Sequence, residues 1–177
     1  MRFNREYKYF NTRPDTTIED IKVQYRNLAI HNHPDRGGDT AVMAAINAEF
    51  DALCKLYNGV HRASDGSTYT NPDKPDIVGP EFRALVDALL RKCDDSVRIE
   101  IVGTFVWVSG NTYGFRDVFK DLGMRYAPKK GMWYKCPFGY VRRHGEATDM
   151  DAIRDTYGVV FDSNGKQTSN RDAIASV

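Results

Sequence analysis

Apolar and polar positions near the start of the chain alternate with the period of an α-helix. Between Thr16 and His31 the apolar residues recur three or four positions apart, the spacing of one helical face. Thr16 or Thr17 suits the N-cap, because its hydroxyl accepts a hydrogen bond from a free backbone N–H of the first turn. The pattern predicts an amphipathic helix that Pro34 brings to an end. Its apolar face comprises Ile18, Ile21, Tyr25, Leu28 and Ala29.

A second helical pattern covers residues 39–59. Asp39 or Thr40 would cap its start, and Gly59 would stop it. Two helices of similar length joined by a short polar loop are expected to pack antiparallel as a hairpin. The aromatic residues of 7–10 predict a short first helix that closes the open side of this hairpin. The apolar face of the second helix comprises Met43, Ile46, Phe50, Leu53 and Tyr57.

The second half of the chain mixes strand-like and helical patterns. Residues 97–103 and 104–110 alternate apolar and polar positions, which predicts two strands with a turn near Gly103. The runs MRYA and MWYKC predict a further hairpin around a turn at residues 128–131. Helices are expected over 80–93, 112–123 and 149–159, the last one stopped by Gly158. The expected fold class is α+β, with an all-helical N-terminal unit followed by a small domain with an antiparallel sheet.

The stretch between the two halves has the composition of a flexible linker. It is rich in Ser, Thr, Asp, Gly and Pro and lacks periodicity. We therefore expect a helical unit over 1–60, a linker over 61–78, an α+β module over 79–160 and a polar, mobile tail over 161–177.

Composition narrows the classes of function. The chain has 177 residues, of which 41% are hydrophobic, enough to build real cores. A net charge of +1 gives no global argument for nucleic acid or an acidic membrane, so any electrostatic recognition must come from local patches. No stretch approaches the roughly 20 apolar residues that cross a bilayer. Cys54, Cys93 and Cys136 fit neither a disulfide framework nor a zinc site, and indicate free thiols in a reducing cytoplasm.

Residues 31–39, HNHPDRGGD, place a histidine, a proline and an aspartate at the end of the first predicted helix. Together with the helices on either side, this stretch resembles the J domain of DnaJ-type co-chaperones. The resemblance covers residues 5–58. It rests on YKYFN, IKVQYRNLAIHNHPD and INAEFDAL, which stand where the family has its first, second and third helices.

The resemblance implies a partner protein and not a reaction on this chain. J domains dock on DnaK-type, seventy-kilodalton ATPase chaperones and stimulate ATP hydrolysis, which locks the chaperone onto a protein client. Carried over to this sequence, His33, Pro34 and Asp35 would trigger the ATPase, and Lys22 and Arg26 would meet an acidic chaperone surface. The alternative is that Asp35 only bonds its own turn and that the two cations form a solvated helix face.

The sequence also departs from the family. Val23 and Asn27 stand where relatives often carry further basic residues, which puts the strength of docking in doubt. The glycine/phenylalanine-rich region and the zinc repeats of full DnaJ proteins are missing, so the chain is like the third class of J proteins. Phosphate-binding loops, nucleophile elbows and paired histidines at metal spacing are missing too, so we expect no enzyme activity, no cofactor and no metal.

The second half carries a cluster in which aromatic residues and cations are interleaved. Such interleaving suits single-stranded nucleic acid, whose bases stack on rings and whose phosphates attract cations. The same cluster would equally clamp a peptide, or its aromatics would simply be the core of a small sheet. The candidate residues are Trp107, Tyr113, Arg116, Lys129, Lys130, Trp133 and Lys135.

This second half resembles an uncharacterised module that follows short J domains in bacteriophage and mobile-element proteins, a resemblance that assigns no residue a role. The sequence as a whole therefore predicts a cytosolic co-chaperone whose second module selects a client or a site. The alternative is a nucleic-acid-binding adaptor of a phage or plasmid that recruits the chaperone secondarily.

Overall fold

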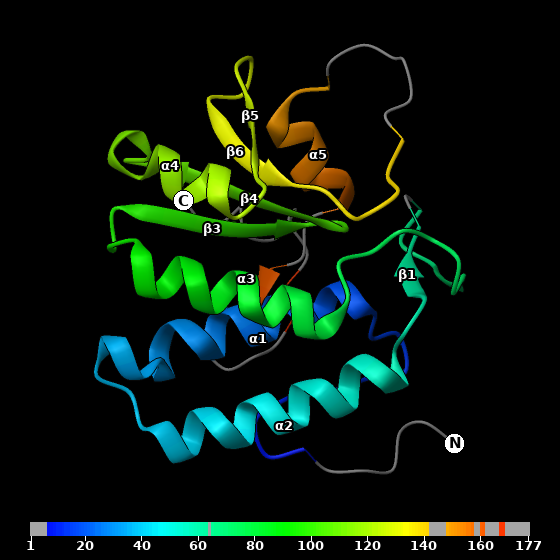
Figure 1. Ribbon diagram of the computed structural model, residues 1–177. Helices are drawn as coiled ribbons and strands as arrows, with labels where there is room; N and C mark the ends of the chain where they lie inside the picture. Colours follow the sequence, from blue (N-terminus) through cyan, green and yellow to red (C-terminus); the bar gives the residue numbers. More distant parts are fainter. Residues whose placement is uncertain (1–6, 64, 142–147, 158–159, 162–166, 169–177) are drawn as a thin grey trace.

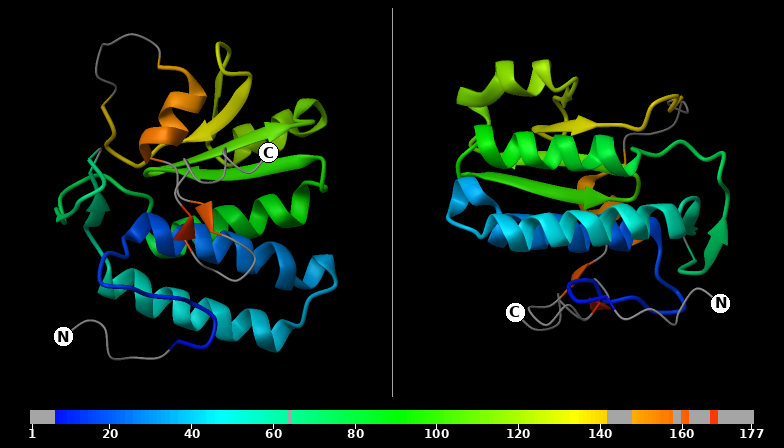
Figure 2. Two further views of the ribbon diagram at one scale, coloured as in Figure 1. Left: turned by 180° about the vertical axis from the view of Figure 1, so that it is seen from behind. Right: turned by 60° about the horizontal axis from the view of Figure 1, so that its bottom comes forward.

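The computed structural model describes residues 7–63, 65–141, 148–157, 160–161 and 167–168. Its helices and strands are stacked in layers (Figure 1). Helix α2 lies at one side of the stack, helices α1 and α3 follow, and a four-stranded sheet lies beyond them. Figures 1 and 2 both show α1 between α2 and the sheet. The bounds of these helices are α1 (Ile18–Asn32), α2 (Thr40–Leu56) and α3 (Gly79–Lys92).

Helices α1 and α2 form the predicted antiparallel hairpin. Thr17 caps α1 through a capping box: its hydroxyl accepts from the backbone N–H of Asp20, whose carboxylate accepts from the backbone N–H of Thr17. Asp39 caps α2 by accepting from two backbone N–H groups of the first turn. The apolar faces meet at Tyr25 and Phe50, whose ring centroids are 4.2 Å apart.

Helix α3 packs against both helices of the hairpin. Its Phe82 is fully buried, with its ring centroid 6.1 Å from that of Tyr25 and 5.9 Å from that of Phe50. One cluster of buried side chains runs from the hairpin through α3 to the sheet. The helical unit and the α+β module therefore share a hydrophobic core.

The sheet is antiparallel, and its strand order is β3-β4-β6-β5. One face carries Ile99 and Val108 and belongs to the core shared with α1 and α3. The opposite face carries Trp107 and Met132 and is partly covered by Met150 of α5. The bounds are β3 (Val97–Val102), β4 (Phe105–Gly110), η2 (Tyr113–Phe115), α4 (Arg116–Asp121), β5 (Arg125–Ala127), β6 (Met132–Lys135) and α5 (Met150–Tyr157).

Two elements differ from the prediction. No helix occurs in residues 7–17; this segment is irregular, with a bend at 8–9 and a turn at 14–15, and side chains of the hairpin bond its backbone. Glu49 accepts the N–H groups of Lys8 and Tyr9, and Gln24 exchanges two hydrogen bonds with the backbone of Asn11. The expected closure of the hairpin is still provided, since the buried ring of Phe10 lies beside that of Phe50.

The second difference lies in the predicted linker. Strands β1 (Val60–Arg62) and β2 (Thr68–Thr70) pair as a hairpin. Two polar side chains of β1 hold it on α1: His61 contacts Glu19 at 2.7 Å, and Arg62 contacts Asp20 at 2.9 Å. This part of the linker is therefore ordered by long-range contacts that local composition does not reveal.

The predicted tail is mostly outside the described residues, as is Gly158, the expected stop of α5. Two short described strands, β7 (Val160–Phe161) and β8 (Gln167–Thr168), pair with each other. Strand β7 runs alongside α1, as the view from behind in Figure 2 shows. Among the helices that the structure describes, none is long and apolar enough to span a bilayer.

Candidate functional site

The His-Pro-Asp loop joins α1 to α2 at one end of the hairpin. His33 ends α1 in an extended conformation (φ −67°, ψ 130°), which is the backbone region that a following proline favours. Residues 34–36 form a single 3-10 turn, closed by a bond from the N–H of Gly37 to the carbonyl of Pro34. Gly37 has a φ of 85°, which a residue with a side chain rarely adopts. The loop is thus a short, well-bonded connection.

The ring of His33 turns inward and not towards solvent. Only 2% of the residue is exposed. Its Nδ1 accepts a hydrogen bond from the backbone N–H of Asp35, so Nε2 carries the proton and donates to Oδ1 of Asp87 on α3, at 2.8 Å. In this structure His33, the residue expected to trigger a partner's ATPase, bonds within the chain, because α3 supplies its acceptor.

Pro34 and Asp35 remain on the surface. The carboxylate of Asp35 lies 3.3 Å from Nε of Arg91, and Arg91 also donates to Asp87 at 2.9 Å. Asp35, Arg91, Asp87 and His33 thus form a continuous polar chain from the loop to α3.

Arg36 makes a second connection between the loop and α3. Its guanidinium donates to the carbonyl oxygens of Leu90 and Cys93 and contacts the carboxylate of Asp95. These carbonyls belong to the last turn of α3, where the helix dipole favours a cation. Arg36 therefore acts as a cap for the end of α3.

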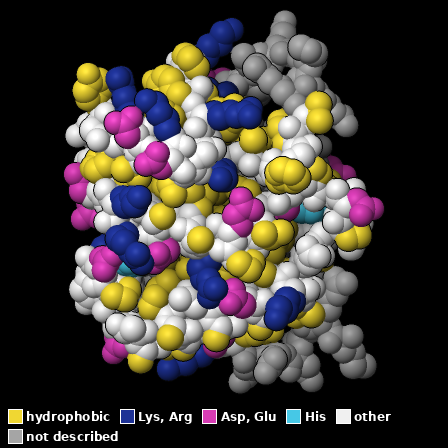
Figure 3. All heavy atoms as spheres, viewed as in Figure 1, with side chains coloured by type: hydrophobic (Ala, Val, Ile, Leu, Met, Phe, Trp, Pro, Cys, Tyr) yellow, Lys and Arg dark blue, Asp and Glu magenta, His cyan; other side chains and the backbone are white. Residues whose placement is uncertain are grey.

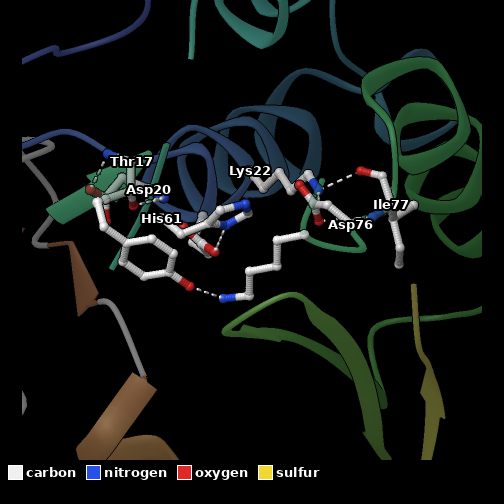
Figure 4. Close-up of polar contacts among 9 residues, drawn as sticks. Thr17, Asp20, Lys22, His61, Asp76 and Ile77 are labelled. Atoms are coloured by element: carbon white, nitrogen blue, oxygen red, sulfur yellow. Dashed lines mark hydrogen bonds and ion pairs between the residues drawn. The ribbon is translucent and has the colours of Figure 1, made fainter. Parts of the chain in front are cut away.

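Lys22 is buried between α1 and the segment that leads into α3. Its ammonium group lies 2.5 Å from Oδ1 of Asp76 and also donates to the carbonyl of Ile77, as Figure 4 shows. Only 2% of the lysine is exposed. Lys22, which the resemblance assigns to an acidic chaperone surface, is buried and paired within the chain, so the alternative of a solvated cation does not apply to it.

Arg26, one turn along α1, is half-buried. Its guanidinium donates to the side chain of Asn27 at 2.6 Å, and burial lowers the pKa of the arginine. The structure therefore brings neither Lys22 nor Arg26 onto an open basic face in this conformation.

A buried polar cluster lies beside Lys22, at the start of α1 (Figure 4). The imidazole of His61, fully buried, bonds Glu19, while Asp20 is held by Thr17 and Arg62. Burial raises the pKa of Asp20, an effect that Arg62 and Thr17 only partly offset. This cluster fixes the β1–β2 hairpin on α1.

Sequence reasoning missed Arg36 within the loop, Asp87 and Arg91 beside it, and Asp76, which pairs with Lys22. One signal was present: Asp87 and Arg91 are an i, i+4 pair inside a helix whose apolar residues form a wide stripe. The apolar face of α3 is wide enough to pack on the sheet and on the hairpin at the same time. That width was a signal that α3 contacts the N-terminal unit.

The candidate residues of the second module do not form one stacking surface. Trp107 pairs with Tyr134, and Trp133 is the residue before Tyr134 in β6, so the two tryptophans lie on opposite faces of the sheet. Each is 7% exposed. Trp133 packs on Phe119 of α4, with ring centroids 5.3 Å apart, and Trp107 packs on Phe105.

The cations of this module are equally dispersed. Lys135 donates to the carbonyl of Leu122, and Lys130 donates to the carbonyl of Thr148 and lies 6.0 Å from the ring of Trp107. Arg116 stacks on the exposed ring of Tyr113, 4.0 Å from its centroid, and Lys129 is exposed. A role of these residues in binding nucleic acid or a client stays a prediction.

The surface view supports this dispersal. On the face that Figure 3 shows, basic and acidic side chains are interspersed over the described residues, without a large patch of one sign. Within the same part of the chain, no group of three or more His, Cys, Asp and Glu residues is arranged to hold a metal ion.

Comparison with known proteins gives partial matches. Over 69 residues the chain is 33% identical to the translocation protein SEC63 homolog of Homo sapiens, covering 39% of this chain and 9% of that protein. It is 38% identical over 47 residues to DnaJ protein homolog 2 of Allium porrum, covering 27% of this chain and 11% of the relative. It is 33% identical over 88 residues to the small t antigen of Budgerigar fledgling disease virus, covering 44% of this chain and 59% of that protein.

The matched parts are therefore small fractions of the SEC63 homolog and the DnaJ homolog, and over half of the small t antigen. No family model and no solved structure matches the chain. These partial similarities support a DnaJ-like J domain in this chain, at the level of the family only.

Proposed function

We propose that this chain is a co-chaperone that docks on a DnaK-type ATPase chaperone through the His33-Pro34-Asp35 loop and stimulates its ATP hydrolysis. The observation that carries the proposal is the position of this loop, held in one conformation at the joint of two antiparallel helices. Partial similarity to a DnaJ homolog supports the same family of activity. The second module would select the client or the site of action.

A fixed loop suits such a role for a physical reason. Pro34 restricts its own backbone and that of His33, and the turn is closed by backbone hydrogen bonds. A preorganised loop loses less conformational entropy on docking, so more of the contact energy becomes affinity. The reaction itself takes place on the partner, and this chain contributes binding groups and no catalytic residue.

The test is the steady-state ATPase rate of a purified DnaK-type chaperone, measured over a concentration series of the full chain. We expect the chain to accelerate ATP hydrolysis and His33→Gln to reduce the acceleration at least tenfold. His31→Gln is the matched control, since among the described residues this exposed histidine makes one hydrogen bond, with the carbonyl of Asn27 in its own helix. Equal acceleration by His33→Gln and the unaltered chain would remove the loop from the mechanism.

A further inference from the structure

Three of the five residues assigned to the chaperone already contact other parts of the chain. Asp76 pairs with Lys22 at 2.5 Å, and Asp87 accepts from His33 at 2.8 Å. Arg91 contacts Asp35 at 3.3 Å. Lys22, His33 and Asp35 therefore each have an oppositely charged or hydrogen-bonding partner on α3 or on the segment that leads into it.

Helix α3 is seated on the hairpin by apolar contacts as well. The ring of Phe82 is buried between Tyr25 and Phe50. At the start of α3 the approach is so close that a Cβ on Gly79 would lie 2.9 Å from the Cβ and Sγ of Cys54 on α2. Because of this contact, α3 covers part of the half-buried Cys54.

The chemistry of the covering groups matches that of an acidic partner. Two carboxylates of the cover lie on residues assigned to docking: Asp76 pairs with Lys22, which would meet an acidic chaperone surface, and Asp87 accepts from His33. We infer that α3, with residues 76–77, is an intramolecular cover over the docking face, and that an acidic surface of a DnaK-type chaperone binds by displacing it. This inference rests on the proposed function and adds a regulatory step to it.

The polar rim of the cover is suited to release. The side chains of Asp87, Arg91 and Asp35 are 40%, 61% and 49% exposed, so each ion pair at this edge contributes little to holding α3 in place. Helix α3 also begins without a side-chain cap, after Val78, which is 61% exposed. A partner that offers its own carboxylates would replace these polar contacts at small net cost, whereas separating the buried ring of Phe82 from the hairpin is the main cost of displacing α3.

The first test is the double variant Asp87→Ala/Arg91→Ala in the full chain. It removes one acid and one base, so the net charge is unchanged, and alanine favours the helix. Because a larger fraction of molecules is uncovered, we expect the concentration that gives half-maximal ATPase stimulation to fall about threefold, equivalent to about 0.7 kcal/mol. The matched control is Asp117→Ala/Lys120→Ala, an exposed acid–base pair on α4, for which we expect no change.

A second readout does not depend on the chaperone. We expect Cys54 to react with a thiol reagent several times faster in the Asp87→Ala/Arg91→Ala variant than in the unaltered chain or the α4 control, with the labelled peptide identified by mass spectrometry. Unchanged Cys54 labelling together with an unchanged half-maximal concentration would overturn the cover while leaving the proposed function intact. If Cys54 labelling rises and no variant stimulates any ATPase, the proposed function fails, and with it the chaperone as the displacing partner.

Discussion

At the scale of single residues, this molecule keeps charged groups in its interior by pairing them. Glu19 and His61 are 5% and 0% exposed, and they contact each other at 2.7 Å. Burial alone would raise the pKa of Glu19, but the hydrogen bond and charge of His61 outweigh it, so this pKa lies below its ordinary value of 4.5. Breaking such a pair by removing one partner leaves an unsatisfied buried group.

The lowered pKa of Glu19 makes a prediction about stability and pH. Because this pKa is lower in the folded than in the unfolded chain, ionised Glu19 stabilises the fold above about pH 4.5, and the contribution is lost as the pH falls through the lowered pKa. We expect Glu19→Gln to lower the free energy of unfolding by about 1–3 kcal/mol near neutral pH. The difference between the two proteins should shrink on acidification, measured by urea unfolding at a series of pH values.

The comparison has internal controls. Burial raises the pKa of Asp20. Because Asp20 is present in both proteins, its contribution to the pH dependence of stability cancels when the two are compared. Glu81→Gln, a change at an exposed glutamate of α3, should leave the pH profile unaltered. The opposite outcome is that the free energies of unfolding of Glu19→Gln and of the unaltered chain differ by the same amount at every pH. That result would show that His61 does not stabilise the charge of the carboxylate.

At the scale of elements, the joint between α1 and α2 depends on a close backbone approach. A Cβ on Gly38 would lie 2.2 Å from the carbonyl carbon and oxygen of Asn32, so it meets backbone that cannot rotate away. By contrast, a Cβ on Gly114 would meet nothing within 4 Å. The glycine is therefore required where α1 ends and the chain reverses.

From this contact we expect Gly38→Ala to destabilise the fold by about 1–3 kcal/mol or more, because overpacking forces the backbone apart. Gly114→Ala is the control and should be close to neutral. Equilibrium urea unfolding of both variants, followed by circular dichroism, measures the difference. Equal urea midpoints for the two variants would mean that the backbone around Gly38 accommodates a Cβ without loss of stability.

Sequence reasoning was most successful for elements with strong local signals. The apolar periodicity and the caps Thr17 and Asp39 predicted α1 and α2, and the alternation around Gly103 predicted β3 and β4. It failed for β1 and β2, because Thr68, Tyr69 and Thr70 are all exposed and carry no alternation. Their order comes from contacts with α1 that lie 42 positions away in the sequence.

At the scale of the whole molecule, the helical unit and the α+β module, which the sequence predicts on either side of a linker, share one hydrophobic core. Local patterns predicted the apolar face of each element but not which faces pack together. The sheet and the helical hairpin both have an apolar surface on which α3 can pack, so its sequence alone does not choose between them. The candidate site was predicted at the level of the loop. The inward turn of His33 was not, because Asp87 lies 54 positions further along the chain.

The most direct test of the co-chaperone account is amide hydrogen exchange of the full chain, alone and with a saturating concentration of an ATP-loaded DnaK-type chaperone. Exchange reports local opening and local protection segment by segment. The account predicts slower exchange in residues 33–38, where the chaperone binds, and faster exchange in residues 85–92, where α3 is displaced. Unchanged exchange in residues 33–38 would contradict it.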